Sequence, residues 1–223
     1  MFTCGEYGDK DGALKAAKIQ DPDYLTHYKT SCTERTCQQF YYYDKGQRKL
    51  KRIWYLTENG YYNYWFISTA RDWRLDTRGM GFDLSANYLY MAYEKSIERI
   101  NMKTNQTEFL IIEPDYGYND GPFADASASL LLDLAFITDD LFVIADYTNS
   151  ILRVFDISTR TVSSICQYQT EFSELFDPGS IRYCHMRKPR SITVSTQKNG
   201  GLYVITGNYI YHIGYSSMWK FYK

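Results

Sequence analysis

The sequence predicts an all-β fold: a β-propeller of four-stranded antiparallel blades, with about four blades present. The first supporting observation is a repeat with the pattern Tyr-Gly-x-x-Asp-Gly. It begins at Tyr7 and again at Tyr116, an offset of 109 residues (116 − 7). This offset suits two units of about 50 residues, the length of a propeller blade with its connections.

A second, shorter repeat halves that period. An aliphatic-x-basic-aliphatic pattern, typical of a strand, occurs four times. Its basic residues are Arg52, Arg99, Arg153 and His212, separated by 47 (99 − 52), 54 (153 − 99) and 59 (212 − 153) residues. Four copies predict four blades. Because the arginines recur once per blade, we interpret them as structural residues.

Each blade contains four apolar or aromatic segments separated by turn residues, and we read the whole chain, 1–223, as one domain. For blade one (22–68), which is the least regular, the expected strands are 24–28, 38–43, 49–56 and 61–67. For blade two (79–112) they are 80–84, 88–92, 97–102 and 107–112. For blade three (130–166) they are 132–137, 141–145, 151–155 and 161–166. For blade four (189–223) they are 191–194, 202–205, 209–213 and 218–222.

Composition agrees with this fold and limits the partners. Aromatic residues make up 17% of the chain, with 23 Tyr and 12 Phe, and aromatic residues favour pleated surfaces. The formal net charge is −1, so no strong positive field draws the chain to nucleic acid. No apolar run reaches the length of a membrane span. We therefore expect no nucleic-acid partner and no membrane insertion by this chain.

Blade three resembles a known family. Its loop Gly117-Tyr-Asn-Asp-Gly121 is followed by a strand and turn, Leu141-Phe-Val-Ile-Ala-Asp-Tyr-Thr-Asn149, and by a strand that contains Arg153. This order is similar to the NHL repeat, and a weaker likeness spans nearly the whole chain. The resemblance implies a propeller scaffold. It names no activity, because propellers carry unrelated functions.

The motif residues have structural interpretations. Asp146, with Thr148 and Asn149, is expected to cap its own turn through side-chain-to-backbone hydrogen bonds. Asp11-Gly12 and Asp120-Gly121 are expected to set tight turns between blades, with Gly allowing positive φ. The string Asp9-x-Asp11-Gly12 resembles a calcium loop but lacks the downstream ligands of one.

The five cysteines and a glycosylation sequon indicate in which cellular compartment the protein resides. Cys166 and Cys184 occupy places where extracellular invertebrate proteins of this pattern carry cysteines, which implies a disulfide. Cys32 and Cys37 could pair with each other, or Cys37 with Cys4; free buried thiols and zinc are the alternatives, although no Cys-x-x-Cys occurs. Asn105-Gln-Thr107 is a possible glycosylation site in a turn. Together these features predict an extracellular, secreted glycoprotein, although no signal peptide precedes the first repeat.

The beginning of the chain predicts an incomplete propeller. Phe2-Thr3-Cys4 aligns with Ser164-Ile165-Cys166, so the chain starts on the last strand of a preceding blade. We expect a longer protein to supply the rest of that blade. Closure of the ring by Met1–Cys4 joining the last blade is the alternative.

Aromatic density in blade one suggests a binding surface. Packing between blades is the alternative interpretation, since alternation sends half of these side chains to the core. The candidates for a partner surface are Tyr43, Tyr62, Tyr64, Trp65 and Trp73.

Two functional hypotheses follow. The first is a non-catalytic binding or scaffold module that presents propeller loops to a protein or glycan partner and needs no cofactor. The alternative is a propeller enzyme, such as a lactonase-like hydrolase or an amidating lyase, with a metal in the central channel. His27, Asp83 and Asp133 are the candidate metal ligands for that alternative. No enzyme signature surrounds them, so we assign no catalytic residue.

Overall fold

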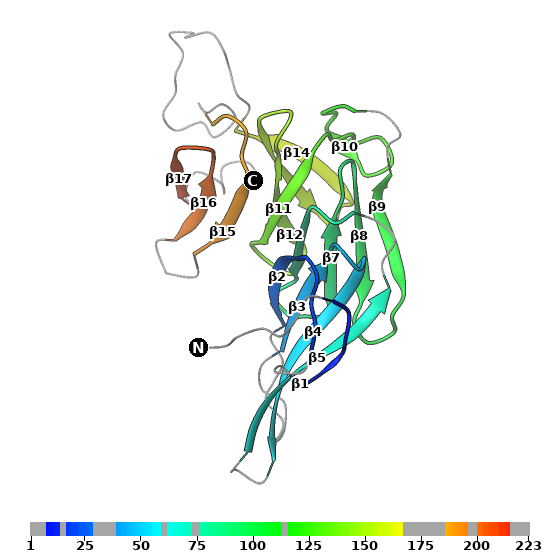
Figure 1. Cartoon of the computed structure of the whole chain (residues 1–223). Helices are drawn as coiled ribbons and strands as arrows, with labels where there is room; N and C mark the ends of the chain where they lie inside the picture. Colours follow the sequence, from blue (N-terminus) through cyan, green and yellow to red (C-terminus); the bar gives the residue numbers. More distant parts are fainter. Residues whose placement is uncertain are drawn as a thin grey trace, which may run out of the picture.

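The computed structural model consists of four antiparallel sheets arranged in a ring, the four blades of a propeller (Figure 1). The structure describes residues 8–13, 17–28, 39–58, 62–72, 76–112, 116–166, 186–195 and 200–214. These residues form strands, turns and bends but no helix, so none of them belongs to a helix long enough to cross a membrane. The predicted all-β fold class is confirmed.

Apart from β1 and β10, the strands of each blade follow one another in sequence across the sheet. Blade one contains β1 (Gly12–Ala13), β2 (Pro22–Tyr28), β3 (Gln39–Asp44), β4 (Lys49–Glu58) and β5 (Tyr62–Asp72). Blade two contains β6 (Gly79–Phe82), β7 (Tyr88–Ala92), β8 (Ser96–Asn101) and β9 (Thr107–Ile112). Blade three contains β10 (Gly121–Pro122), β11 (Leu131–Phe136), β12 (Leu141–Asp146), β13 (Ile151–Asp156) and β14 (Thr161–Ile165). Blade four contains β15 (Ser191–Val194), β16 (Gly201–Ile205) and β17 (Ile210–Gly214), and the strand expected at 218–222 lies outside the described residues.

Two very short strands were not predicted. β1 and β10 precede their blades in sequence but pair with the outermost strands, β5 and β14. Both begin at the glycine of an Asp-Gly pair, where φ is 145° at Gly12 and 133° at Gly121. The expected positive φ is therefore confirmed at both glycines. Glycine is suited to these positions, since it adopts such a φ without steric cost. Each connection thus adds a fifth strand to the blade that it introduces.

The blades pack face to face through apolar clusters. The first strands β2, β6, β11 and β15 lie beside one another in that order around the centre. Alternation divides each strand between two interfaces: Phe142 and Ile144 face blade two, whereas Val143 and Ala145 face blade four. Burial on both faces therefore explains why β12 is almost continuously apolar.

The strand pairing corrects one position of the basic repeat. The turn that joins the second and third strands closes on the pairs Asp44↔Lys49 in blade one and Asp146↔Ile151 in blade three. Counting from these pairs, the equivalent of Arg153 is Lys51, so the prediction of Arg52 was wrong by one residue. Lys51 is fully buried, whereas Arg52 is half-buried.

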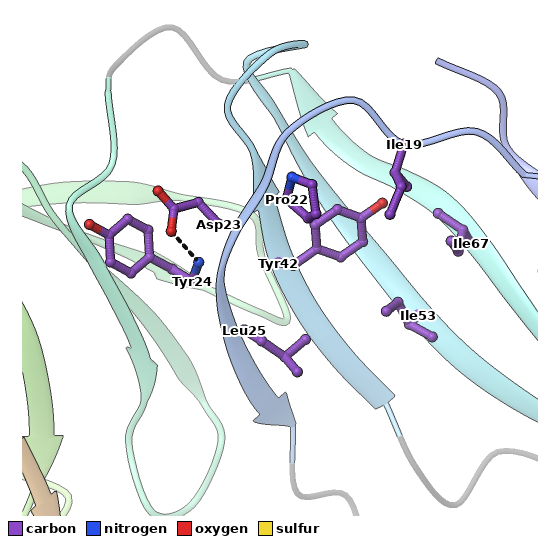
Figure 2. Close-up of a pocket in the computed structure, with 8 residues that line it drawn as sticks. All are labelled: Ile19, Pro22, Asp23, Tyr24, Leu25, Tyr42, Ile53 and Ile67. Carbon is purple, nitrogen blue, oxygen red and sulfur yellow. Dashed lines mark hydrogen bonds between the residues drawn. The ribbon is translucent and has the colours of Figure 1, made fainter. Parts of the chain in front are cut away.

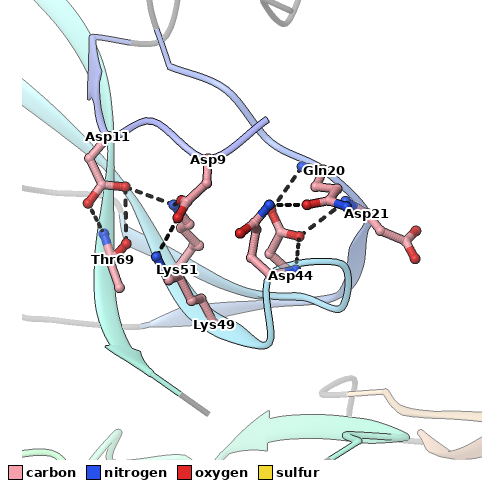
Figure 3. Close-up of polar contacts among 9 residues, drawn as sticks. Asp9, Asp11, Gln20, Asp21, Asp44, Lys49, Lys51 and Thr69 are labelled. Atoms are coloured by element: carbon pink, nitrogen blue, oxygen red, sulfur yellow. Dashed lines mark hydrogen bonds and ion pairs between the residues drawn. The ribbon is translucent and has the colours of Figure 1, made fainter. Parts of the chain in front are cut away.

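The buried cations bind the carboxylates of the Tyr-Gly-x-x-Asp-Gly repeat in the same way in both copies. In blade three, Asp120 lies 3.2 Å from Arg153 Nη2 and accepts a 2.9 Å hydrogen bond from the Ser164 backbone N–H. In blade one, Asp11 lies 2.9 Å from Lys51 Nζ and accepts a 2.6 Å hydrogen bond from the Thr69 backbone N–H (Figure 3). The carboxylate of each repeat therefore fixes its connection to the third and outermost strands.

Asp9 takes part in the same network. It accepts hydrogen bonds from Lys49 and Lys51, and these bonds lower the pKa of its carboxyl group (Figure 3). For Asp11, burial raises the pKa, but the hydrogen bonds from Lys51 and Thr69 outweigh it and the net shift is downward. Lysine side chains thus hold the carboxylates that resemble a calcium loop.

A buried aspartate organises the turn between the second and third strands in blades three and one. Asp146 is fully buried and accepts hydrogen bonds from Asn149 Nδ2 (2.8 Å) and from the backbone N–H groups of Asn149 and Ser129 (both 3.4 Å). Burial raises the pKa of this carboxyl group. The predicted cap is confirmed, and the bond to Ser129 adds a link to the preceding connection. Asp44 acts similarly in blade one, accepting from the backbone N–H groups of Gln20 and Asp21 (Figure 3). It also accepts from the backbone N–H of Gln47.

Candidate functional site

A groove of about 460 Å³ opens between blades three and four. Three segments meet there because successive turns of an antiparallel blade alternate between its two ends. The β12–β13 turn, the β16–β17 turn and the connection that enters β15 all emerge at one end. We call this site the inter-blade groove; it is lined by Tyr147, Arg187, Lys188, Arg190, Thr206, Gly207, Asn208, Tyr209 and Tyr211.

One wall consists of two cations stacked on a tyrosine. Tyr147 directly follows the turn aspartate Asp146, and its backbone N–H donates to the Leu130 carbonyl at 2.9 Å, so its position is fixed by the fold. Lys188 Nζ lies 5.4 Å and Arg190 Cζ 5.3 Å from the centre of its ring. Arg190 Nη2 also donates to the Tyr147 hydroxyl at 3.3 Å. These contacts hold both cations at the edge of the groove.

The other wall is formed by the tight β16–β17 turn, with the exposed Tyr209, and by the half-buried Tyr211 of β17. The Thr206 backbone N–H donates to the Tyr209 carbonyl at 3.0 Å, which closes the turn between β16 and β17. Tyr209 is 66% exposed, and its ring lies edge-to-face with that of Tyr211 at 6.2 Å. The Arg190 backbone N–H donates to the Ile205 carbonyl at 2.8 Å and joins the two walls. The groove is therefore preformed.

The groove carries positive charge. Its described lining includes three cationic side chains and no Asp or Glu. Lys188 and Arg190 are exposed, and neither forms a salt bridge with any carboxylate of the described residues. This local charge contrasts with the net charge of −1 for the chain.

The predicted aromatic binding residues do not form this groove. Tyr43 is 1% exposed and packs with Leu50 and Met80 between blades one and two, so its side chain serves the core. Tyr62, Tyr64 and Trp65 lie on β5, in the part that pairs with Tyr55–Glu58 of β4 beyond the end of β3 (Figure 1). Trp73 lies outside the described residues.

The candidate metal ligands each have partners of their own. The His27 ring packs on Phe40 with ring centres 4.9 Å apart, and Asp83 accepts a 3.1 Å hydrogen bond from the Tyr88 backbone N–H. Asp133 accepts hydrogen bonds from Ser191 Oγ at 2.6 Å and from a backbone N–H at 3.0 Å. Burial raises the pKa of both carboxyl groups. Within the described residues, which include all three, no group of three His, Cys, Asp or Glu side chains is placed to hold a metal ion.

The features that bear on the compartment are only partly described. Cys166 is buried at the end of β14 and is disulfide-bonded, whereas Cys4, Cys32, Cys37 and Cys184 lie outside the described residues. Asn105 is exposed in the turn between β8 and β9, where the sequence predicted it. A glycan could reach its side chain without disturbing a strand.

A second cavity, of about 270 Å³, lies on blade one (Figure 2). It is on the sheet face opposite to Tyr41 and Tyr43, which pack against blade two. Ile53 and Ile67 form its floor, and the exposed Leu25 lies at its margin. This cavity is smaller than the inter-blade groove, and its described lining contains no cationic side chain.

Comparison with known proteins shows the fold. No family model and no curated protein matches the chain, so the NHL likeness stays a resemblance. Solved structures do match. An auxiliary nutrient binding protein from Bacteroides thetaiotaomicron is 14% identical, with a TM-score of 0.59 over 84% of this chain and 46% of that one. Its counterpart from Bacteroides ovatus is 11% identical, with the same TM-score and coverage. A chain in a nidogen/laminin complex is 13% identical, with a TM-score of 0.52 over 83% of this chain and 56% of that one.

The chain thus spans about half the length of these solved chains. Similarity at this level of identity describes the architecture and not the ligand. The positions of the groove residues therefore carry the functional argument.

Proposed function

We propose that this chain is a non-catalytic binding or scaffold module, and that the inter-blade groove receives its protein or glycan partner. The observation that carries the proposal is a preformed groove with exposed recognition side chains. The hydrogen bond from Arg190 to Ile205 joins its walls, while Tyr209 extends into solvent. A preformed site saves the entropy of ordering its loops when a ligand binds.

The side chains of the groove suit recognition. Tyrosine provides a large apolar surface with a polar end, and arginine provides a planar set of donors; both are enriched at the energetic centres of interfaces. Asn208 adds amide groups at the same end of blade four. The similar solved structures include nutrient-binding proteins and a member of a protein complex, and both kinds of partner accord with the proposal.

Replacement of Tyr209 by alanine tests the groove. A screen of glycans and secreted proteins would first identify a partner, and Tyr209→Ala should then weaken that partner's affinity by about tenfold. Calorimetric titration would measure the change. Tyr118→Ala is the matched control, because Tyr118 is comparably exposed but lies outside the groove. Equal affinity of the two variants for every partner found would contradict the proposal.

We further propose that the protein is secreted, with a Cys166–Cys184 disulfide and a glycan on Asn105. The bonded state of Cys166 and the exposed turn at Asn105 support this. Protein secreted from eukaryotic cells and digested without reduction should yield a peptide that links the two cysteines. A separate peptide that contains Asn105 should carry a glycan, and Asn105→Gln should abolish that glycosylation. A linkage of Cys166 to another cysteine, or an unmodified Asn105 in secreted protein, would refute the corresponding part.

A further inference from the structure

We propose that the ligand of the inter-blade groove is an acidic glycan, a sugar chain that bears carboxylate or sulfate groups. This inference rests on the proposed function and names the chemistry of the same site. Three observations support it: the state of the two cations, the arrangement of the walls and the kinds of side chain in the lining.

The cations are available for an anionic ligand. Lys188 and Arg190 rest on the Tyr147 ring and form no salt bridge within the described residues. An anion that reaches them therefore breaks no ion pair with a described residue, and it gains charge-assisted hydrogen bonds that are stronger than neutral ones. Their contacts with Tyr147 already restrict both side chains, which lowers the entropy lost on binding.

The two walls of the groove offer different contacts to a sugar chain. The cations lie on the connection before β15. Across the groove lie Tyr209, in the β16–β17 turn, and Tyr211, on β17. A sugar ring has an apolar C–H face that packs on an aromatic ring and hydroxyl groups that bond to Asn208 and to the backbone. Its carboxylate or sulfate would then face Lys188 and Arg190. A chain of sugars fits a groove that has exposed Tyr209 on one side and two cations on the other.

The lining favours a glycan over an acidic peptide. None of the described lining residues is aliphatic. A peptide segment usually anchors itself by placing an apolar side chain in a desolvated pocket, and this groove provides none. A peptide rich in Asp and Glu would use the charges but leave the tyrosine surface without a matching partner.

Four probes distinguish these ligands in calorimetric titrations of the whole chain. They are a sulfated heparin-derived octasaccharide, an oligogalacturonate that bears only carboxylates, neutral xylohexaose and a Glu-rich octapeptide. We expect one or both acidic glycans to bind. The variant Lys188→Gln/Arg190→Gln should weaken that binding by about tenfold or more. Arg190→Lys, which keeps the charge, should lose less than Arg190→Gln.

The control is Lys103→Gln/Arg48→Gln, which removes the same two charges at exposed positions on other blades. It should bind as the unchanged protein does, because exposed charges farther away than about 10 Å are screened at 0.1 M salt. Thermal unfolding of every variant verifies that it is folded.

Each result of these titrations either supports or rejects the acidic glycan as the ligand of the groove. Groove-dependent binding of an acidic glycan supports the inference, and the response to the two acidic probes identifies sulfate or carboxylate. Groove-dependent binding of only the neutral glycan or the peptide overturns the acidic glycan but leaves a binding module. Acidic-glycan binding that the control variant weakens equally also overturns the inference. If none of the four probes binds, the acidic glycan is rejected, while the proposed function is judged separately by the partner screen with Tyr209→Ala.

Discussion

Replacement of Gly79 by alanine is expected to destabilise the protein by about 3 kcal/mol or more. Gly79 lies on β6, the first strand of blade two, directly against β11 of blade three. A Cβ atom there would lie 1.7 Å from the Leu132 carbonyl oxygen and 3.1 Å from the Asp133 Cα. Both are backbone atoms, so no side-chain rotation relieves the clash and the two blades must separate. Urea unfolding followed by fluorescence measures the free energy of unfolding.

Gly207→Ala is the matched control for this prediction. A Cβ at Gly207 would meet no atom within 4 Å, so the free energy of unfolding should change by less than about 0.5 kcal/mol. If Gly79→Ala proves as stable as Gly207→Ala, blades two and three do not approach as closely as described.

Removal of the Asp120 carboxylate should cost about 2 kcal/mol of stability, because it leaves the buried Arg153 cation without its ion-pair partner. The cost stays below that of breaking a fully buried pair, since the Asp120 side chain is 45% exposed. Arg153 is 1% exposed, and Asp120 is its carboxylate partner. Its Nε and Nη1 atoms have no hydrogen-bond partner in the described part of the chain, and burial already lowers the pKa of its guanidinium. Asp120→Ala therefore leaves a buried cation whose remaining hydrogen-bond acceptor, among the residues that the structure describes, is the Asn119 carbonyl. Chemical denaturation measures the loss.

The companion variant tests the cause. In Asp120→Ala/Arg153→Met an apolar side chain of similar length replaces the unpaired cation, so we expect at least half of the lost stability to return. Asp125→Ala, an exposed position in the same connection, should change the stability by less than about 0.5 kcal/mol. A double variant no more stable than Asp120→Ala would show that the lost hydrogen bonds to Ser164, and not the unpaired charge, account for the cost.

The sequence was sufficient to predict the blades, because the propeller repeats local features. Arg99 and Arg153 recur at equivalent positions of their blades. Asp146 caps the turn that follows it, as the nearby Asn149 predicted. The pattern failed at Arg52 because hydrophobic spacing alone does not fix the register of a strand. The strand register is instead set by the buried aspartate of the turn. The pairing of Asp44 with Lys49 shows that the buried cation of blade one is Lys51.

The site could not be predicted in the same way. The residues of the inter-blade groove come from three separate segments, around Tyr147, around Lys188 and around Tyr209. Packing between blades brings these segments together, and no short-range pattern records it. Aromatic density pointed instead to Tyr43, but β-strand alternation turns that ring into the core. The usable signal was the run Arg187-Lys188-Pro-Arg190, three basic residues just before the first strand of a blade.

The bond between Asp120 and Ser164 also sets an order of events during synthesis. The two residues are 44 positions apart, and the corresponding Asp11 and Thr69 are 58 apart. The ribosome makes the carboxylate first and its partner strand last. In a nascent chain that ends before Ser164, the connection ahead of blade three lacks the hydrogen bond from Ser164 to Asp120. In each of these two blades, the hydrogen bond between the outermost strand and the preceding connection can therefore form only after that strand has left the ribosome.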